Sequence, residues 1–269
     1  MKLLLVGGGK MGGAMLEGWL NGSLTPADVT VVEPSADAAA ALSRNLGVTC
    51  VADASDLGAD AAPETVVLAV KPQMMDDALP AYARFTGPHC LFVSIAAGKT
   101  ISYFEKHLGS EAAIVRAMPN TPAAVGRGVT VGCPNAHVSE SQRVWADELL
   151  AAVGEVAWVE DEDQIDAVTA LSGGGPAYVF LLAEVMTEAG VQAGLPADLA
   201  MRLARVTVSG AGELMHQSSD EPATLRKNVT SPGGTTAEAL KILMADGALQ
   251  SLMTKAIAAA TRRSKELAG

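Results

Sequence analysis

Leu3-Leu4-Leu5-Val6-Gly7-Gly8-Gly9-Lys10-Met11-Gly12 is the stretch that decides the fold of this 269-residue chain. A short apolar run ends in glycines, and a helical pattern follows at once. The spacing Gly7, Gly9, Gly12 fits G-x-G-x-x-G, and its position between a strand and a helix indicates a turn that admits a pyrophosphate at the helix N-terminus. Glu33 then ends the next strand, about 20 to 25 residues on, where a carboxylate can accept from ribose hydroxyls. A dinucleotide site is therefore favoured over a purely structural turn.

The first half of the chain alternates short apolar runs with helical patterns. Near-continuous apolar strands separated by helices are typical of a parallel sheet covered on both faces, and right-handed crossovers make a doubly wound sheet the expected architecture. The expected strands are Lys2–Val6, Val29–Glu33, Thr65–Val70, Cys90–Ile95, Ala113–Ala117, Val129–Cys133 and Glu155–Val159. The expected helices are Met11–Leu20, Ala36–Leu46, Met74–Arg84, Ile101–Leu108 and Glu140–Ala152.

The second half shows helical periodicity only. The expected helices are Ile165–Ser172, Ala177–Gly194, Asp198–His216, Pro222–Val229, Thr235–Met244 and Leu249–Leu267. We therefore expect a dinucleotide-binding domain over residues 1–160 and an all-helical domain over residues 161–269. Several of these helices are apolar on more than one face, which indicates burial against a second subunit.

Composition excludes several classes of function. The 19 basic and 30 acidic residues give a net charge of −11, which is unsuited to nucleic acid or anionic membranes. The N-terminal apolar run is too short for a signal peptide, and no run of 18 apolar residues exists, so we expect a cytoplasmic protein. Three separated cysteines (Cys50, Cys90 and Cys133) and four histidines lack metal-ligand spacing, so no metal site is expected.

Ser231-Pro232-Gly233-Gly234-Thr235-Thr236 is a second glycine-rich turn that opens a helix. Free N–H groups and two hydroxyls suit a small anion such as a carboxylate. A plain capping loop between two helices explains the same residues. Gly173-Gly174-Gly175-Pro176 has the same ambiguity, because proline is common in the first turn of a helix.

Together these segments resemble the pyrroline-5-carboxylate reductase family over essentially the whole chain. In the first half the matching stretches are Gly7–Gly12, Ala69–Pro72, Ser94–Gly98 and Arg116–Pro122. In the second half they are Asp166–Tyr178 and Val229–Thr236, whose order and spacing are highly specific. One departure is Gly174, where the family usually has serine. The resemblance implies a Rossmann-like doubly wound domain, an all-α C-terminal dimerisation domain, active sites at the subunit boundary and commonly a ring of dimers, a decamer.

The resemblance also implies the activity: reduction of 1-pyrroline-5-carboxylate to L-proline by hydride transfer from NADPH or NADH, the last step of proline biosynthesis. The implied cofactor-binding residues are Val6, Gly7, Gly9, Lys10, Met11, Glu33, Pro34, Ser35, Ala69, Val70, Lys71, Pro72, Ile95, Ala96, Ala97 and Asn228. The implied substrate-binding residues are Glu162, Ser231, Gly233, Gly234, Thr235 and Thr236, with Thr236 at the reacting imine.

A site without a strong acid or nucleophile suits this chemistry, because a protonated cyclic imine already accepts hydride well and needs mainly positioning. The β-hydroxyacid dehydrogenases share the two-domain layout, but they need a helix-borne lysine in a G-x-x-G-x-x-x-K-x-x-N setting. None of Lys227, Lys241, Lys255 and Lys265 has that setting. A silent dinucleotide sensor would keep Gly7–Gly12 but has no reason to keep Ser231–Thr236.

The choice between NADH and NADPH depends on Glu33. Two unit charges about 4 Å apart interact by roughly 4 kcal/mol at an effective dielectric near 20. No arginine lies in the turn 33–36 to compensate the 2′-phosphate. We therefore expect a preference for NADH, unless Glu33 turns away and Ser35 with the following helix N-terminus holds the phosphate.

Overall fold

A computed structural model describes residues 2–268 and divides into two compact units. Residues up to Gly173, together with those from Ala260 onward, form the first unit, which is named the sheet unit. Residues Gly174–Ala259 form the second, which is named the helical unit.

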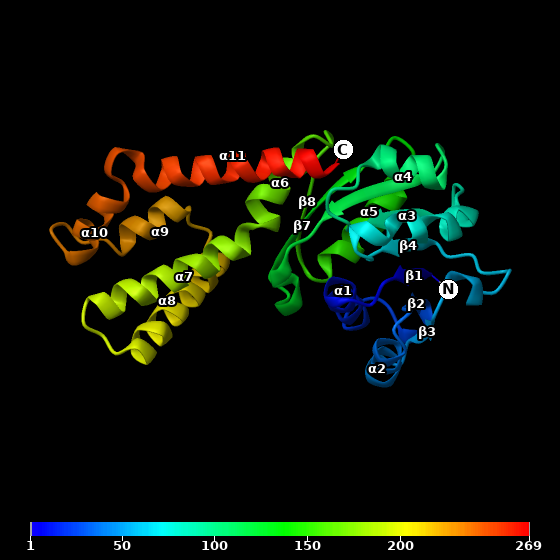
Figure 1. The fold of residues 1–269 in the computed structure, drawn as a ribbon, viewed down its shortest axis with the longest axis horizontal. Coiled ribbons are helices and arrows are strands. Elements are labelled where there is room, and N and C mark those ends of the chain that lie inside the picture. The colour runs from blue at the N-terminus through cyan, green and yellow to red at the C-terminus, as the bar shows by residue number, and fades with distance from the viewer. Residues whose placement is uncertain (1, 269) are drawn as a thin grey trace. The chain divides into compact units, whose positions relative to one another are not determined.

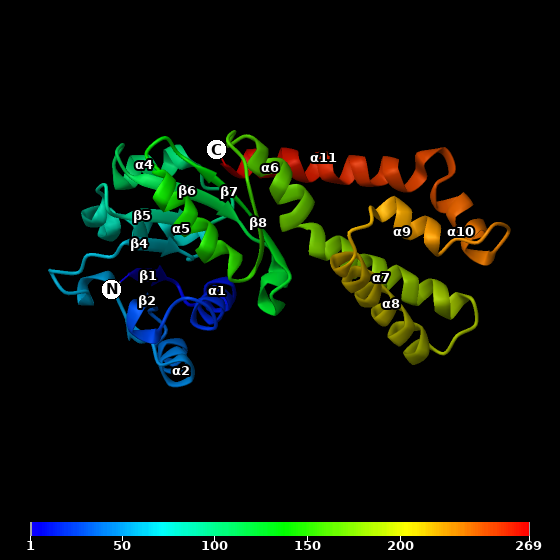
Figure 2. The same ribbon diagram turned by 180° about the vertical axis from the view of Figure 1, so that it is seen from behind.

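Eight strands of the sheet unit form one sheet in the order β3-β2-β1-β4-β5-β6-β7-β8 (Figures 1 and 2). Neighbouring strands are parallel except β6 and β7. The strands are β1 Leu3–Val6, β2 Val29–Val32, β3 Thr49–Val51, β4 Thr65–Leu68, β5 Leu91–Ser94, β6 Ala113–Met118, β7 Gly128–Pro134 and β8 Gly154–Trp158. The doubly wound architecture expected from the sequence is confirmed.

Helices cover both faces of this sheet. The α-helices are α1 Lys10–Leu20, α2 Ala36–Leu46, α3 Met75–Ala78, α4 Ile101–Leu108, α5 Glu140–Ala151 and α6 Gln164–Val168. The 3₁₀ turns are η1 Pro26–Asp28, η2 Ala54–Asp56, η3 Pro72–Met74, η4 Leu79–Phe85 and η5 Thr121–Val125, and η6 Thr169–Gly173 is a π-helical turn.

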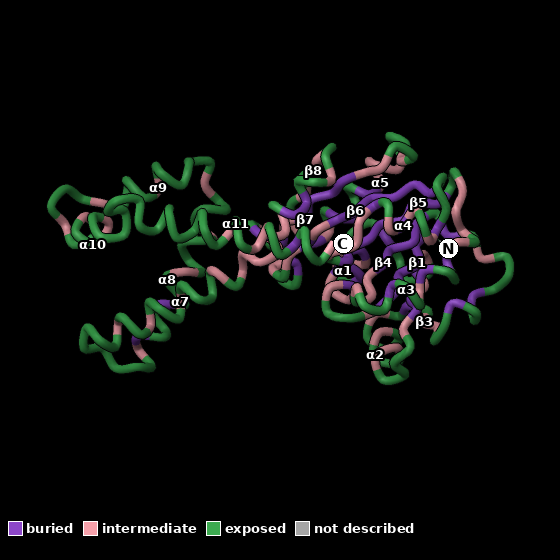
Figure 3. Tube along the Cα trace, turned by 45° about the horizontal axis from the view of Figure 1, so that its top comes forward, coloured by how far each residue is buried: buried purple, intermediate pink, exposed green. Residues whose placement is uncertain are grey.

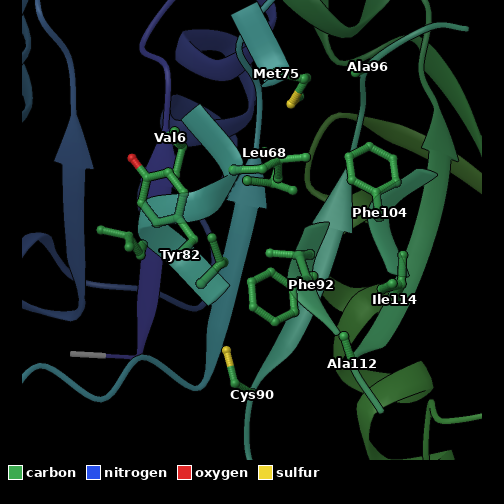
Figure 4. Packing of buried hydrophobic residues seen from close by; sticks show 14 of the residues in the cluster. Val6, Leu68, Met75, Tyr82, Cys90, Phe92, Ala96, Phe104, Ala112 and Ile114 are labelled. Carbon is green, nitrogen blue, oxygen red and sulfur yellow. The ribbon is translucent and has the colours of Figure 1, made fainter. Parts of the chain in front are cut away.

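Alternation along each strand divides the core into two layers, one on each face of the sheet. Leu4 belongs to a cluster with residues of α3, η4 and α4, whereas Leu5 belongs to a cluster with residues of α1, α2 and α5. Figure 4 shows the first layer, where the labelled side chains include Leu68, Tyr82, Phe92, Phe104 and Ile114. Because both faces are buried, the strands need the apolar runs seen in the sequence.

Three details differ from the sequence-based expectations. Strand β7 runs antiparallel to β6, because the connection 119–127 is too short for a parallel crossover. The helix expected over Met74–Arg84 is wrong: only Met75–Ala78 is α-helical, and Leu79–Phe85 is a 3₁₀ turn with Pro80 near its start. Proline lacks the N–H that an α-helix needs at that position. The short edge strand β3 was not expected.

The helical unit contains α7 Gly175–Gln192, α8 Ala197–Gln217, α9 Pro222–Asn228, α10 Thr235–Leu243, η7 Ala245–Gly247 and the larger part of α11 Ala248–Ala268. Figure 3 shows buried strands in the sheet unit and largely exposed helices here. Large apolar side chains such as Phe180, Val206 and Ile242 are 62–75 % exposed. The helical stretch Gln164–Gln192 is also long and apolar enough, by length and composition, to cross a membrane. An exposed apolar surface of this extent indicates burial against another protein surface.

Candidate active site

The turn between β1 and α1 has the backbone geometry that a dinucleotide needs. Gly7 has φ +99°, and a Cβ there would lie 3.0 Å from the carbonyl of Ala69. A Cβ on Gly12 would collide with the carbonyl oxygen of Gly7. At Gly9 a Cβ would meet no atom of the described residues within 4 Å, so the backbone of the turn is open there. The first glycine permits the turn, the last permits close packing of the helix, and the middle one leaves room for a pyrophosphate.

Glu33 lies beside this turn, immediately after β2. One carboxylate oxygen accepts from the backbone N–H of Gly8 at 2.9 Å, and the other accepts from the N–H of Ser35 at 3.0 Å. The Ser35 hydroxyl in turn accepts from Ala38 N and caps α2. These bonds fix the half-buried carboxylate at the edge of the glycine turn, so Glu33 does not turn away from it in this structure.

Two more segments predicted to bind the cofactor end at the same edge of the sheet. Strands β1, β4 and β5 are parallel neighbours, so their carboxyl ends lie together. Ala69 N donates to Val6 O at 2.8 Å, and Ile95 N donates to Leu68 O at 3.1 Å. Ala96 N donates to the Ser94 hydroxyl at 3.2 Å. The predicted residues of 6–11, 33–35, 69–72 and 95–97 are thereby gathered along one edge, where open α/β sheets bind ligands.

The donors at this edge suit a nicotinamide dinucleotide. The open Gly9 backbone and the N-terminus of α1 favour a pyrophosphate, and Glu33 can accept from ribose hydroxyls. Lys10, at the start of α1, adds a positive charge near the expected phosphates. The residues present therefore fit this cofactor.

Glu162, predicted to bind substrate, has a partner within the sheet unit. Its Oε1 lies 2.7 Å from Arg116 Nη1 and also accepts from Ile101 N at 2.8 Å. The Arg116 side chain is only 5 % exposed. Arg116 is not among the site residues predicted from the sequence. An arginine inside the apolar strand β6 is nevertheless a signal, because a buried charge needs a partner.

The second glycine-rich turn opens α10 in the helical unit. Gly233 has φ +69°, and Gly234 N donates to Ser231 O at 3.0 Å. The N-cap residue is Gly234, and no side chain of the described part caps the helix. Thr235 and Thr236 are exposed and occupy the first helical positions, where N–H groups have no carbonyl one turn earlier to bond. Thr236 is therefore not the N-cap residue, which weakens the capping explanation of this turn.

Asn228, predicted to contact the cofactor, is the last residue of α9 and is exposed. At the other glycine-rich segment, Gly174 is the N-cap of α7, and no side chain among residues 2–268 caps this helix. Serine, which the family usually has there, would provide a hydroxyl at that position.

Known protein families and relatives of this chain agree with this geometry. Residues 162–267 match the family model described as pyrroline-5-carboxylate reductase dimerisation, and residues 2–98 match that of NADP oxidoreductase, coenzyme F420-dependent. The pyrroline-5-carboxylate reductase of Pseudomonas aeruginosa is 41 % identical, over 99 % of this chain and 97 % of its own length. The chain belongs to the pyrroline-5-carboxylate reductase family.

Solved reductases of this family have the same fold. The Coxiella burnetii enzyme is 37 % identical with a TM-score of 0.93, covering 100 % of this chain and 98 % of its own. The Plasmodium falciparum enzyme, solved with NADP bound, is 30 % identical with a TM-score of 0.82 and the same coverage. The family resemblance, the Rossmann-like sheet domain and the helical dimerisation domain are thus confirmed, and the chain is an NAD(P)H-dependent oxidoreductase.

Proposed function

We propose that this chain reduces 1-pyrroline-5-carboxylate to L-proline, with the cofactor on the glycine edge of the sheet unit and the substrate at the turn Ser231–Thr236. The observation that carries the proposal is the open glycine turn above the adjoining carboxyl ends of β1, β4 and β5. In this proposal residues 1–160 bind the dinucleotide, and residues 161–269 form the dimerisation segment, as predicted from the sequence. Production of proline by the purified chain, with equimolar oxidation of reduced cofactor, tests this assignment.

When bound, a reduced nicotinamide would supply the hydride that adds to the ring carbon of the substrate. The electron pair of the C=N bond moves to the protonated ring nitrogen, which becomes the amine of proline. The protein therefore needs to hold, orient and shield the reactants rather than supply a strong acid. In this proposal the Thr236 hydroxyl hydrogen-bonds to the ring nitrogen, while the N–H groups of Gly233 and Thr235 bind the carboxylate. Gly234 shapes the turn through its own N–H, which donates to Ser231 O.

Glu162 remains our proposed acidic contact of the substrate. Its Oε1 is bonded to Arg116 and Ile101 N, and the Glu162 side chain is 28 % exposed, so solvent reaches part of this side chain. The bond to Arg116 also gives Glu162 a structural role. Kinetic and stability measurements on one variant separate the two roles.

Glu33 is the basis for proposing NADH as the preferred cofactor. Its carboxylate is fixed by Gly8 N and Ser35 N beside the expected ribose, where the extra phosphate of NADPH would add negative charge. Ser35, which could otherwise help to hold that phosphate, uses its hydroxyl to cap α2 and its N–H to bind Glu33. Comparison of kcat/KM for the two cofactors tests the proposal.

We also infer a cytoplasmic homodimer, with a ring of dimers as a further step. The exposed apolar faces of α7 and α8, which include Phe180 and Val206, need a cover, and a second copy of the same helices provides one. Burial against a second copy also accounts for the apolar stretch Gln164–Gln192 without a membrane. An active monomer in light scattering at assay concentration would contradict the dimer.

A further inference from the structure

A cavity of about 490 Å³ lies next to the segments assigned to the nicotinamide. Its lining includes Pro72 after β4 and Ala97 after β5, both predicted cofactor contacts, and Thr169 of η6. Gln73, Gly98 and Lys99 also line it, and Ser264 and Leu267, from the last turns of α11, lie in the same lining. These turns belong to the sheet unit, although most of α11 belongs to the helical unit. The family resemblance assigned no role to them.

A buried hydrogen bond fixes this end of α11. Ser264 Oγ donates to Asp166 Oδ1 at 2.5 Å, and the two residues are 7 % and 8 % exposed. Asp166 lies in α6, one turn before the π-helical turn that carries Thr169. A carboxylate this buried requires a donor, so the pair holds α11 in one register against α6.

A close backbone approach brings the same turn of α11 to the segment after β5. Gly98 has φ +73°, and a Cβ there would lie 3.3 Å from the carbonyl oxygen of Leu267. The Leu267 side chain is 60 % exposed, so its apolar surface is available to a ligand in the cavity. Two independent contacts, Ser264–Asp166 and Gly98–Leu267, thus place α11 beside the predicted nicotinamide contacts 95–97.

We propose that the last turns of α11 form a wall of the nicotinamide pocket, with Leu267 against the nicotinamide end of the cofactor and Ser264–Asp166 as the positioning pair behind it. The proposal rests on the proposed function, because it takes the cavity beside Pro72 and Ala97 as the nicotinamide end. Parallel sheets of this kind hold a dinucleotide across their carboxyl edge. The adenosine half, expected near Glu33, does not reach this wall.

The test compares two ligands that differ only at the nicotinamide end. Affinities of the full-length protein for NADH and for ADP-ribose are measured by calorimetry for wild type, Leu267→Ala, Ser264→Ala and Ser264→Thr. For Leu267→Ala and Ser264→Ala we expect the NADH affinity to fall about tenfold, while the ADP-ribose affinity changes less than about twofold. Ser264→Thr keeps the hydroxyl and should retain most of the NADH affinity.

The outcomes separate this proposal from the proposed function. If Leu267→Ala leaves the NADH affinity unchanged, or lowers the NADH and ADP-ribose affinities equally, the last turns of α11 do not form a wall of the nicotinamide pocket. Because Leu267 is exposed, that variant decides the question even if Ser264→Ala fails to fold. The wild-type protein could bind both ligands, and the variants could show the expected losses of NADH affinity, while the wild type reduces no pyrroline-5-carboxylate. That result would overturn the proposed function and support the place of α11 in the nicotinamide pocket. Wild-type protein that binds neither ligand would overturn both.

Discussion

Arg116 and Glu162 form an ion pair, with 2.7 Å between Nη1 and Oε1, that joins strand β6 to the segment before α6. The same carboxylate oxygen accepts from Ile101 N at the start of α4. One acidic side chain therefore links three segments of the sheet unit and neutralises an arginine that is nearly inaccessible to solvent. Cys133 lies opposite Arg116 on the neighbouring strand β7, where burial raises the pKa of its thiol, the charge of Glu162 raises it further and that of Arg116 lowers it.

Glu162→Gln should destabilise the protein, because it leaves the buried Arg116 without its counter-charge. Loss of one partner of a fully buried pair costs about 3–5 kcal/mol, and the partial exposure of Glu162 places the expected loss near 2–3 kcal/mol. Glu160→Gln is the matched control, because its ion pair with Arg143 is largely exposed and should contribute less than about 1 kcal/mol. Denaturant unfolding measures both variants. An increase in the substrate KM of folded Glu162→Gln would support its substrate contact, whereas an unchanged KM would leave only the structural role.

Thr236→Ala should lower kcat/KM for the imine by about one to two orders of magnitude, because a hydrogen bond to a charged group contributes roughly 1.5–3 kcal/mol. Thr236→Ser keeps the hydroxyl and should retain most activity. Stability should change little, since Gly234 is the N-cap of α10. Ser139→Ala provides the contrast: Ser139 caps α5 through Gln142 N, so this change should cost about 1 kcal/mol of stability and leave the kinetics unchanged. If Thr236→Ala behaves like Ser139→Ala, the substrate assignment is wrong.

Glu33→Gln should raise kcat/KM for NADPH relative to NADH, because it removes the negative charge beside the expected 2′ position. A tenfold change in the ratio corresponds to about 1.4 kcal/mol, a modest fraction of the expected repulsion. Asp37→Asn, in the first turn of α2, removes the same charge from an exposed position and should change the ratio by less than about twofold. If the ratio of kcat/KM for NADPH to that for NADH is unchanged in Glu33→Gln, Glu33 does not determine the cofactor preference.

The sequence predicted best those elements whose signals are local. Helices α2 and α4 have the expected bounds, since Ser35 and Thr100 cap them and Gly47 and Gly109 end them. The Met74–Arg84 prediction failed because apolar spacing resembles an α-helix while Pro80 forbids one. The edge strand β3 has too few residues to show a period. The Arg116–Glu162 pair joins residues far apart in sequence, and only the fold shows that they meet.

The buried thiols should react slowly with a thiol reagent, and they should make the stability of the protein depend on pH. Burial raises the pKa of Cys90 to about 12 and that of Cys133 to about 11, from an ordinary value of 9.0. A thiol reagent at pH 8 should therefore label the half-buried Cys50 first, and Cys50→Ser should remove that phase. Rapid labelling of all three thiols in the native protein would contradict this order.

The stability of the protein should fall above about pH 9, because the pKa values of Cys90 and Cys133 are raised in the folded state. The folded state holds the Cys90 and Cys133 protons more tightly than the unfolded state, so their contribution to stability is complete below about pH 9. It is lost as the pH rises toward about 11 for Cys133 and 12 for Cys90, by up to about 1.4 kcal/mol per pH unit for each thiol. Cys90→Ala should flatten the loss of stability above pH 9, and an unchanged slope would contradict the burial effect.

Reduction of 1-pyrroline-5-carboxylate by the purified wild-type protein, followed with NADH and with NADPH in parallel, tests the central claim most directly. Proline should form in an amount equimolar to the cofactor oxidised, with the higher kcat/KM for NADH. Absence of proline with both cofactors would contradict the assigned reaction. A clear NADPH preference would leave the reaction in place and contradict the role given to Glu33.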